Sequence, residues 1–198
     1  MFEKFPGIGP RQARRFVQYL LQQPPSIRGT LADEIKKLGA GTFQCKFCFR
    51  WAVKDHQGST LKSPGVKVEP LCSICVNTHR DKQTLFVVEK DADIETVERS
   101  GYHGLYFVLG GTVPLAAEEP VKHIRMKELV RRVNKDGVSE IILGLSATTE
   151  GDHTRLILQE NLNECGIKVS SLGRGLSTGS ELEYADPDTI GQALANRH

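Results

Sequence analysis

Two Cys-x-x-Cys pairs constrain this chain more than any other sequence feature. Cys45 and Cys48 form the first pair and Cys72 and Cys75 the second, with 23 residues between the pairs. Each pair places two sulfurs on one side of a tight turn, and two such pairs complete the tetrahedral thiolate set that suits Zn²⁺. Residues 42–84 are too poor in apolar residues to fold by packing alone. The pattern predicts a finger organised by one structural zinc ion per chain, with residues 62–65 in a loop between the pairs.

Two other roles for the cysteines fit the sequence less well. Structural disulfides belong to oxidising compartments, whereas residues 1–5 do not form the basic segment and apolar core of a secretion signal. A redox Cys-x-x-Cys needs the strand–helix junction of a thioredoxin-like unit, which the pattern lacks. No apolar run approaches the roughly 18 residues of a membrane span. We therefore expect a cytoplasmic protein without a membrane partner.

Residues 85–170 alternate between short apolar runs and segments with apolar residues at helical spacing. The runs fall at 85–88, 105–109, 141–143 and 167–169. Parallel strands that are buried on both faces have this appearance, because helices connect and cover them. The alternation predicts an α/β domain with a parallel sheet. A final helix is expected near residues 190–194.

The first 41 residues predict two helices separated by Pro24 and Pro25. A glycine loop, Gly7-Ile8-Gly9, comes before the first helix, and three arginines follow it: Arg11, Arg14 and Arg15. Glycines flanking a buried isoleucine let the backbone approach a phosphate closely, and the free amides of a helix start can hold its oxygens. The pattern is typical of a helix-hairpin-helix that binds DNA without reading its sequence. An ordinary turn before a solvated basic helix is the other interpretation.

Charge is divided unevenly along the chain and favours the DNA-binding interpretation. Residues 1–85 contain 14 Lys and Arg against 6 Asp and Glu, whereas residues 86–198 contain 12 against 18. The net charge of +2 hides this division. The positively charged N-terminal part suits binding to a polyanion such as nucleic acid, whereas the negatively charged remainder does not.

Acidic residues follow two of the predicted strands. Glu89 closes the first strand of the α/β segment, and Glu150 and Asp152 follow the third. Ligands gather beyond the carboxyl ends of parallel strands, and acids placed there hold Mg²⁺ in Toprim domains. Acids at helix starts also complement the helix dipole without any metal. The residues alone leave both interpretations open.

Taken together, these parts resemble the RecR family of bacterial recombination mediators over nearly the whole chain. The most specific elements are Thr149-Glu150-Gly151 and the glycine-rich, acidic string at residues 173–186. The resemblance implies an α+β fold of several modules. These are a helix-hairpin-helix at 1–41, a four-cysteine zinc finger at 42–84, a Toprim domain with a parallel sheet at 85–170, and an oligomerisation tail with a helix at 171–198.

The resemblance also implies a function without catalysis in recombinational DNA repair. Members form ring-like homo-oligomers around DNA, expected here to be tetramers, and act with RecO and RecF to load RecA at gaps. Gly7, Ile8, Gly9, Arg11, Arg14 and Arg15 would bind DNA. Cys45, Cys48, Cys72 and Cys75 would bind zinc, and Glu89 and Glu150 would serve contact with RecO.

Three features depart from the family pattern. One is the insert between the two cysteine pairs, which is longer than is usual in the family. The chain begins almost at the glycine loop, which shortens the family's leading helix, and residues 145–148 (Leu-Ser-Ala-Thr) replace the family's typical Thr-Asn-Pro-Thr. Two other functions would use the same parts. One is a Mg²⁺-dependent Toprim nuclease or primase-like enzyme that uses Glu89, Glu150 and Asp152, and the other is a zinc-finger regulator that reads a specific DNA site.

Overall fold

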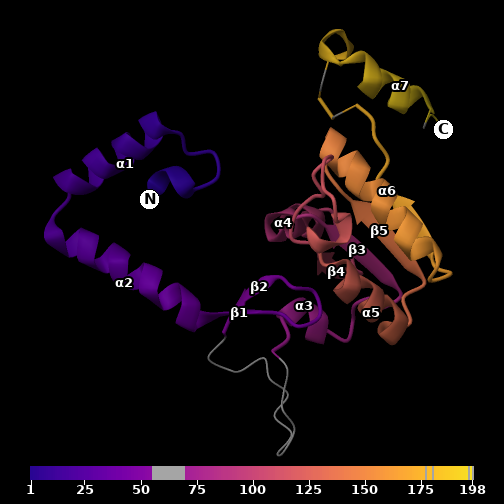
Figure 1. Ribbon diagram of the computed structural model, residues 1–198, viewed down its shortest axis with the longest axis horizontal. Helices are drawn as coiled ribbons and strands as arrows, with labels where there is room; N and C mark the ends of the chain where they lie inside the picture. Colours follow the sequence, from indigo (N-terminus) through magenta and orange to yellow (C-terminus); the bar gives the residue numbers. More distant parts are fainter. Residues whose placement is uncertain (55–69, 177, 180, 196, 198) are drawn as a thin grey trace, which may run out of the picture. The chain divides into compact units, whose positions relative to one another are not determined.

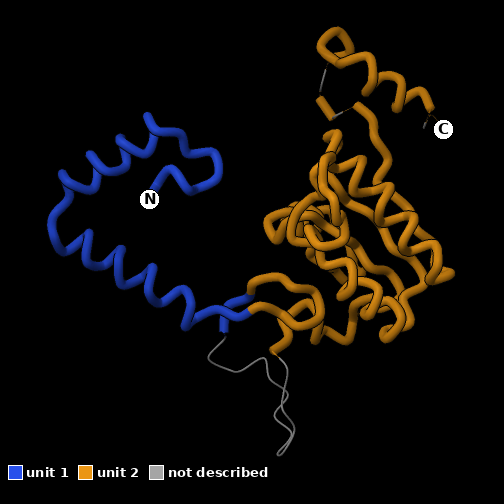
Figure 2. Tube along the Cα trace, viewed as in Figure 1, with its two compact units in different colours: residues 1–43, 52–58 blue, residues 44–51, 59–198 orange. Residues whose placement is uncertain are grey.

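The computed structural model describes residues 1–54, 70–176, 178–179, 181–195 and 197. The loop expected at residues 62–65 lies outside these ranges. The chain divides into two compact units (Figure 2): residues 1–43 and 52–58 form the first, and residues 44–51 and 59–198 the second. The boundary falls between the predicted helical module and most of the finger, so the cysteines belong to the second unit.

Among its described residues, the first unit contains the 3-10 turn η1 (Phe2–Lys4) and the helices α1 (Pro10–Gln22) and α2 (Pro25–Gly41). Each helix starts with proline, which has no amide hydrogen to leave unsatisfied and whose fixed φ suits a first helical residue. Pro24 and Pro25 separate the two helices, as the sequence predicted. Phe2 stacks on Phe5 and Phe16, with ring centroids 6.2 and 5.9 Å apart. Ile8 was expected to be buried, but it is only partly buried.

The described residues of the finger contain two short strands and one helical turn. β1 (Thr42–Gln44) and β2 (Trp51–Val53) pair in a two-stranded sheet. The helical turn, α3 (Ser73–Val76), lies in the second half of the finger. Between the strands the backbone turns back on itself: the Cys45 amide donates to the Arg50 carbonyl at 2.9 Å. This turn holds the first cysteine pair.

The second unit is built on a four-stranded parallel sheet in the order β4-β3-β5-β6 (Figure 1). Its elements, in chain order, are β3 (Thr84–Val88), α4 (Asp91–Arg99), β4 (Leu105–Val108), η2 (Pro120–Lys122), α5 (Met126–Asp136), β5 (Glu140–Gly144), α6 (Thr149–Asn163) and β6 (Lys168–Ser171). The alternation predicted from the sequence is confirmed. β3 and β5 are flanked on both sides, whereas β4 is an edge strand.

The strands bury both faces, as their continuous apolar runs require. Leu85 and Val87 of β3 pack in the main core with residues of α5 and α6, including Leu129 and Leu158. Phe86, one residue out of phase, points to the other face. There it meets Tyr102 edge-on at 5.3 Å. Tyr102 also meets Tyr106 edge-on at 5.3 Å, so the three rings form an aromatic cluster on this face.

The tail contains η3 (Leu182–Tyr184) and α7 (Pro187–Ala195). α7 starts earlier than predicted, because Asp186 accepts a hydrogen bond from the Thr189 amide at 2.8 Å and so caps the helix. Leu182, Tyr184 and Leu194 are exposed. Within the described residues, no helix combines the length and apolar character that a membrane span requires.

Candidate metal centre, basic loop and strand-end acids

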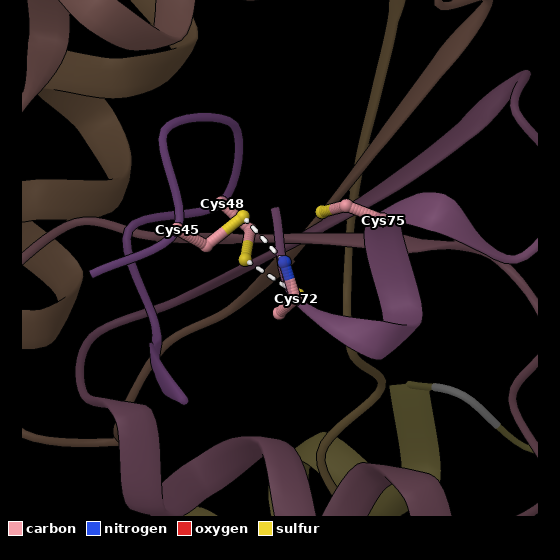
Figure 3. Close-up of side chains that lie close together, drawn as sticks. All are labelled: Cys45, Cys48, Cys72 and Cys75. Atoms are coloured by element: carbon pink, nitrogen blue, oxygen red, sulfur yellow. Dashed lines mark hydrogen bonds between the residues drawn. The ribbon is translucent and has the colours of Figure 1, made fainter. Parts of the chain in front are cut away.

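The four cysteines converge on one point (Figure 3). Cys45 and Cys48 lie in the turn after β1, Cys72 caps the start of α3, and Cys75 lies within that helix. Their sulfur atoms all lie within 4.8 Å of one another, and Cys45, Cys48 and Cys72 are buried. Among the described residues, they form the one group of three or more potential ligands close enough to share an ion.

The spacing of the sulfurs fits a single tetrahedral ion. A metal–sulfur bond of about 2.3 Å places the sulfurs of a tetrahedron about 3.8 Å apart. The sulfurs of Cys48 and Cys72 are 3.6 Å apart, and the Cys72 amide donates to the Cys45 sulfur at 3.4 Å. The hydrogen bond between Cys48 and Cys45 lowers the pKa of Cys45 and raises the pKa of Cys48, so the cluster without a cation favours a thiolate at Cys45. Four sulfurs leave no open coordination position.

The turn that holds Cys45 and Cys48 rests on the edge strand of the sheet. The Val108 amide of β4 donates to the Cys48 carbonyl at 2.9 Å. Phe49 meets Phe107 edge-on at 5.4 Å, and the Arg125 guanidinium lies 5.2 Å from the centre of the Phe49 ring. These contacts cover part of an edge that would otherwise be open to another strand. They also hold Phe49 at a φ of 62°, a region that bulky residues rarely adopt.

Arg80 fastens the chain where it leaves the finger. Its guanidinium pairs with both carboxylate oxygens of Glu98 on α4 and donates to the Gly104 carbonyl at 3.0 Å. The Tyr106 hydroxyl donates to the same carboxylate at 2.6 Å. The hydrogen bond from Arg80 lowers the pKa of Glu98, whereas burial, followed by the bond to Glu98, raises the pKa of Tyr106.

The glycine loop forms a tight turn between η1 and α1. Gly7 has a φ of 75°, in the left-handed region that favours glycine, and the Ile8 amide donates to the Phe5 carbonyl at 3.1 Å. Gly9 caps α1 and accepts the first helical hydrogen bond, from Ala13. The amides at the start of the helix therefore have no helical acceptor.

Arg11, Arg14 and Arg15 are exposed on the first two turns of α1. The first turn of this helix contains no acidic residue. Within the described part of the chain, none of the three arginines pairs with a carboxylate. The loop amides and these side chains offer hydrogen-bond donors and positive charge to an anion.

Glu89 lies buried at the end of β3 and is held by the loop after β5. One carboxylate oxygen accepts hydrogen bonds from both the amide and the hydroxyl of Ser146, each at 2.7 Å. The Ser146 hydroxyl also lies 3.1 Å from that of Thr148, which accepts from the Gly151 amide and caps α6. Ser146 belongs to the four-residue stretch that departs from the family pattern.

Glu150 and Asp152, both in the first turn of α6, have partners of their own. Glu150 accepts from the Thr112 hydroxyl at 3.1 Å. Asp152 pairs with Arg174 of the tail and lies 3.3 Å from Arg155. The hydrogen bonds from Arg174 hold the pKa of Asp152 below its usual range. Ser146, Thr112 and Arg174 were not identified from the sequence, and only the place of Arg174 in the glycine-rich string hinted at a role.

The fold and the cysteine cluster define a Toprim-domain protein with a four-cysteine metal finger. Residues 83–173 match the family model for the Toprim domain, and residues 175–198 match the model for the RecR C-terminal region. Curated relatives align over almost the full chain. Recombination protein RecR of Dehalococcoides mccartyi is 38% identical over 98% of this chain and 88% of its own length. Its counterpart in Bacteroides thetaiotaomicron is 38% identical over 99% and 89%, and that of Chloroflexus aggregans 36% identical over 99% and 89%.

The chain therefore belongs to the RecR family. The resemblance inferred from the sequence motifs is confirmed, and so is the mixed α+β fold with a parallel Toprim sheet. The structure places four cysteines together as a metal site, as predicted. The four module boundaries stay a prediction.

Proposed function

We propose that this chain is a recombination mediator that binds DNA without reading its sequence and performs no catalysis. It would act in the cytoplasm as a clamp-like homo-oligomer, a tetramer, with RecO and RecF as partners in loading RecA at gaps. Membership of the RecR family supports this role. The observation that carries the DNA-binding part is the glycine loop followed by three exposed arginines without carboxylate partners in the described residues.

Gly7, Ile8 and Gly9 would bring the backbone close to one phosphate, whose oxygens the free amides at the start of α1 would bind. Arg11, Arg14 and Arg15 would add charge on neighbouring phosphates. These contacts recognise the DNA backbone and carry no base information, which suits a clamp that must act at any gap. Their strength depends on salt, because each contact releases counterions.

Zn²⁺ is the ion we propose for the cysteine cluster. Four thiolates in a compact tetrahedral arrangement are typical of structural zinc. With all four coordination positions taken by sulfur, the ion would stabilise the finger and leave no position for a substrate. Phe49 and Arg125 would then fix the loaded finger on the sheet edge.

Glu89 and Glu150 are proposed to serve contact with RecO rather than phosphoryl chemistry. A Mg²⁺ ion needs oxygen ligands that are free to turn toward it. In this chain Glu89 accepts from Ser146, Glu150 accepts from Thr112, and Asp152 pairs with Arg174. Each acid is thus committed to a donor of its own chain, which supports a role in positioning the loop after β5.

The helices of the first unit offer apolar surface for assembly. Leu21 of α1 and Ile35 and Leu38 of α2 are 69%, 59% and 62% exposed. Ala13 is the one described residue of these two helices that is buried. Helices stabilise a fold by burying an apolar face, so this exposure supports contact with a second copy.

The test compares DNA affinity of the parent chain with that of an Arg11→Ala, Arg15→Ala variant over a range of salt concentrations. We expect weaker binding and a salt slope shallower by about 2, since each lost phosphate contact removes about one unit. The matched control is Lys36→Ala, Lys37→Ala, which removes two exposed charges from α2 of the same unit. The control should bind as the parent does. An equal loss of DNA affinity in both variants would mean that only the net charge of the chain matters. Unchanged affinity of the arginine variant would refute the proposed interface.

A further inference from the structure

A basic hollow lies in the second unit, between the Cys45–Cys48 turn and α5. It measures about 410 Å³. Lys46 contributes from the turn, and Arg131, Arg132 and Lys135 contribute from one face of α5, where residues three and four apart are neighbours. Phe47 forms the wall between them. None of these side chains has a part in the metal cluster or in the strand-end acids.

The cations of the hollow are arranged around Phe47. The Arg132 guanidinium lies 5.5 Å from the centre of its ring and the Lys135 ammonium 5.7 Å. Arg132 is 6% exposed and forms the floor. Its Nε lies 3.2 Å from Asp136, and its Nη1 donates to the Tyr106 carbonyl at 3.3 Å. The aromatic ring and the buried arginine thus fix the shape of the wall.

The charge of the hollow is only partly balanced. Asp136 forms an ion pair with Arg132, and Glu128 is the other acidic residue of the lining. Lys46, Arg131 and Lys135 have no carboxylate within ion-pairing distance among the residues that the structure describes, and all three are exposed. Arg132 Nη2 is buried without a hydrogen-bond partner in the same residues. Burying a charged nitrogen without a partner costs free energy, and an anion bound near Arg132 would offset part of that cost by electrostatic attraction.

We infer that this hollow is a second binding site for the phosphodiester backbone of DNA, formed by Lys46, Arg131 and Lys135 over the Arg132 floor. The inference rests on the proposed function that this chain binds DNA. It differs from the glycine loop in location, since its residues belong to the second unit. It also differs in kind: here side-chain cations of α5 and of the Cys45–Cys48 turn would bind the phosphate, whereas backbone amides would bind it at the glycine loop.

The lining favours a nucleic acid over an acidic protein segment. Protein partners anchor themselves by burying apolar and aromatic side chains in the centre of an interface. Here the two aromatic rings of the hollow are already engaged by cations: Phe47 by Arg132 and Lys135, and Phe49 by Arg125. What the surface offers is positive charge without an apolar anchor, and the phosphate backbone is recognised in that way.

The test uses the full chain with Lys46→Gln, Arg131→Gln and Lys135→Gln combined. Binding to a duplex oligonucleotide of random sequence is measured over a range of salt concentrations. We expect affinity about tenfold lower at low salt and a salt slope shallower by about 2 to 3, from three lost phosphate contacts. The control, Lys82→Gln with Arg99→Gln and Lys122→Gln, removes the same charge from exposed positions of the same unit and should bind as the parent.

Two further measurements separate the possible failures. A charge-keeping variant, Lys46→Arg with Arg131→Lys and Lys135→Arg, should restore binding. If the glutamine variant binds DNA as the parent does while Arg11→Ala, Arg15→Ala loses binding, the hollow is not a DNA site and the proposed function stands. If the parent binds no DNA, the proposed function itself fails. Polyglutamate of matched charge that binds the hollow as strongly as DNA does would overturn the preference for phosphodiester.

Discussion

Replacing Arg80 with alanine tests how the finger is fastened to the Toprim sheet. The substitution removes both hydrogen bonds to Glu98, the bond to the Gly104 carbonyl and the contact of the guanidinium with the Tyr106 ring at 5.8 Å. Breaking a fully buried ion pair costs about 3–5 kcal/mol, and an exposed pair contributes less than about 1 kcal/mol. The Arg80 side chain is 13% exposed and that of Glu98 32%. The expected loss in the free energy of unfolding is therefore about 2–4 kcal/mol.

Urea denaturation of the parent, Arg80→Ala, Glu98→Ala and the double variant measures this loss and apportions it. A coupling energy of about 1–3 kcal/mol is expected, because the two side chains are in direct contact. The pH dependence provides a second readout. Since Arg80 lowers the folded pKa of Glu98, the stabilisation is complete above the ordinary glutamate pKa near 4.5 and is lost as pH falls through the lower folded value. A coupling energy near zero, or equal acid sensitivity of parent and Arg80→Ala, would refute the reasoning.

Three further outcomes follow from the structure. Removing metal with a chelator should release one zinc per chain and lower the midpoint of thermal unfolding. Cys75→Ser should likewise lose the metal and lower the midpoint, whereas the control Cys165→Ser, outside the cluster, should keep the metal. An unchanged midpoint after complete metal release would contradict a structural role. Gly144→Ala should cost about 1–3 kcal/mol in urea denaturation, because its new Cβ would lie 2.1 Å from the Phe86 ring in the core; the smaller Phe86→Leu should rescue it. The raised pKa of Tyr106 means that stability falls as pH rises above the ordinary tyrosine pKa of 10, and Tyr106→Phe should remove that part of the alkaline loss.

The alternation of strands and helices could be predicted because the apolar runs are short and are separated by segments with helical spacing, a combination typical of buried parallel strands with connecting helices. The run at 85–88 became β3 (Thr84–Val88), and the segment between this run and the next contains α4 (Asp91–Arg99). The start of α7 was missed for a local reason. Asp186 caps the helix and Pro187 is its first residue, a pair typical of a helix start. The prediction instead followed the apolar residues at 190–194 and so placed the start too late.

The surroundings of α1 and α2 could not be predicted in the same way. The sequence predicted the second of these helices, in which Leu31, Ile35 and Leu38 recur at helical spacing, but spacing does not say what covers an apolar face. In the structure these residues are exposed. The sequence pattern reports only that a face exists.

The strand-end acids show where prediction from sequence stops for a functional site. The positions of Glu89 and Glu150 at the ends of strands followed from local patterns, and both interpretations, metal binding and helix capping, were consistent with those patterns. What separates them is the donor that each carboxylate meets, and these donors are 57 and 38 residues away. A contact over that distance depends on the register of β3 against β5 and on the path of two loops. Ser146, in the stretch that departs from the family pattern, supplies two of the three hydrogen bonds involved. A change of residue at 146 therefore alters what Glu89 is free to bind without changing the acid itself.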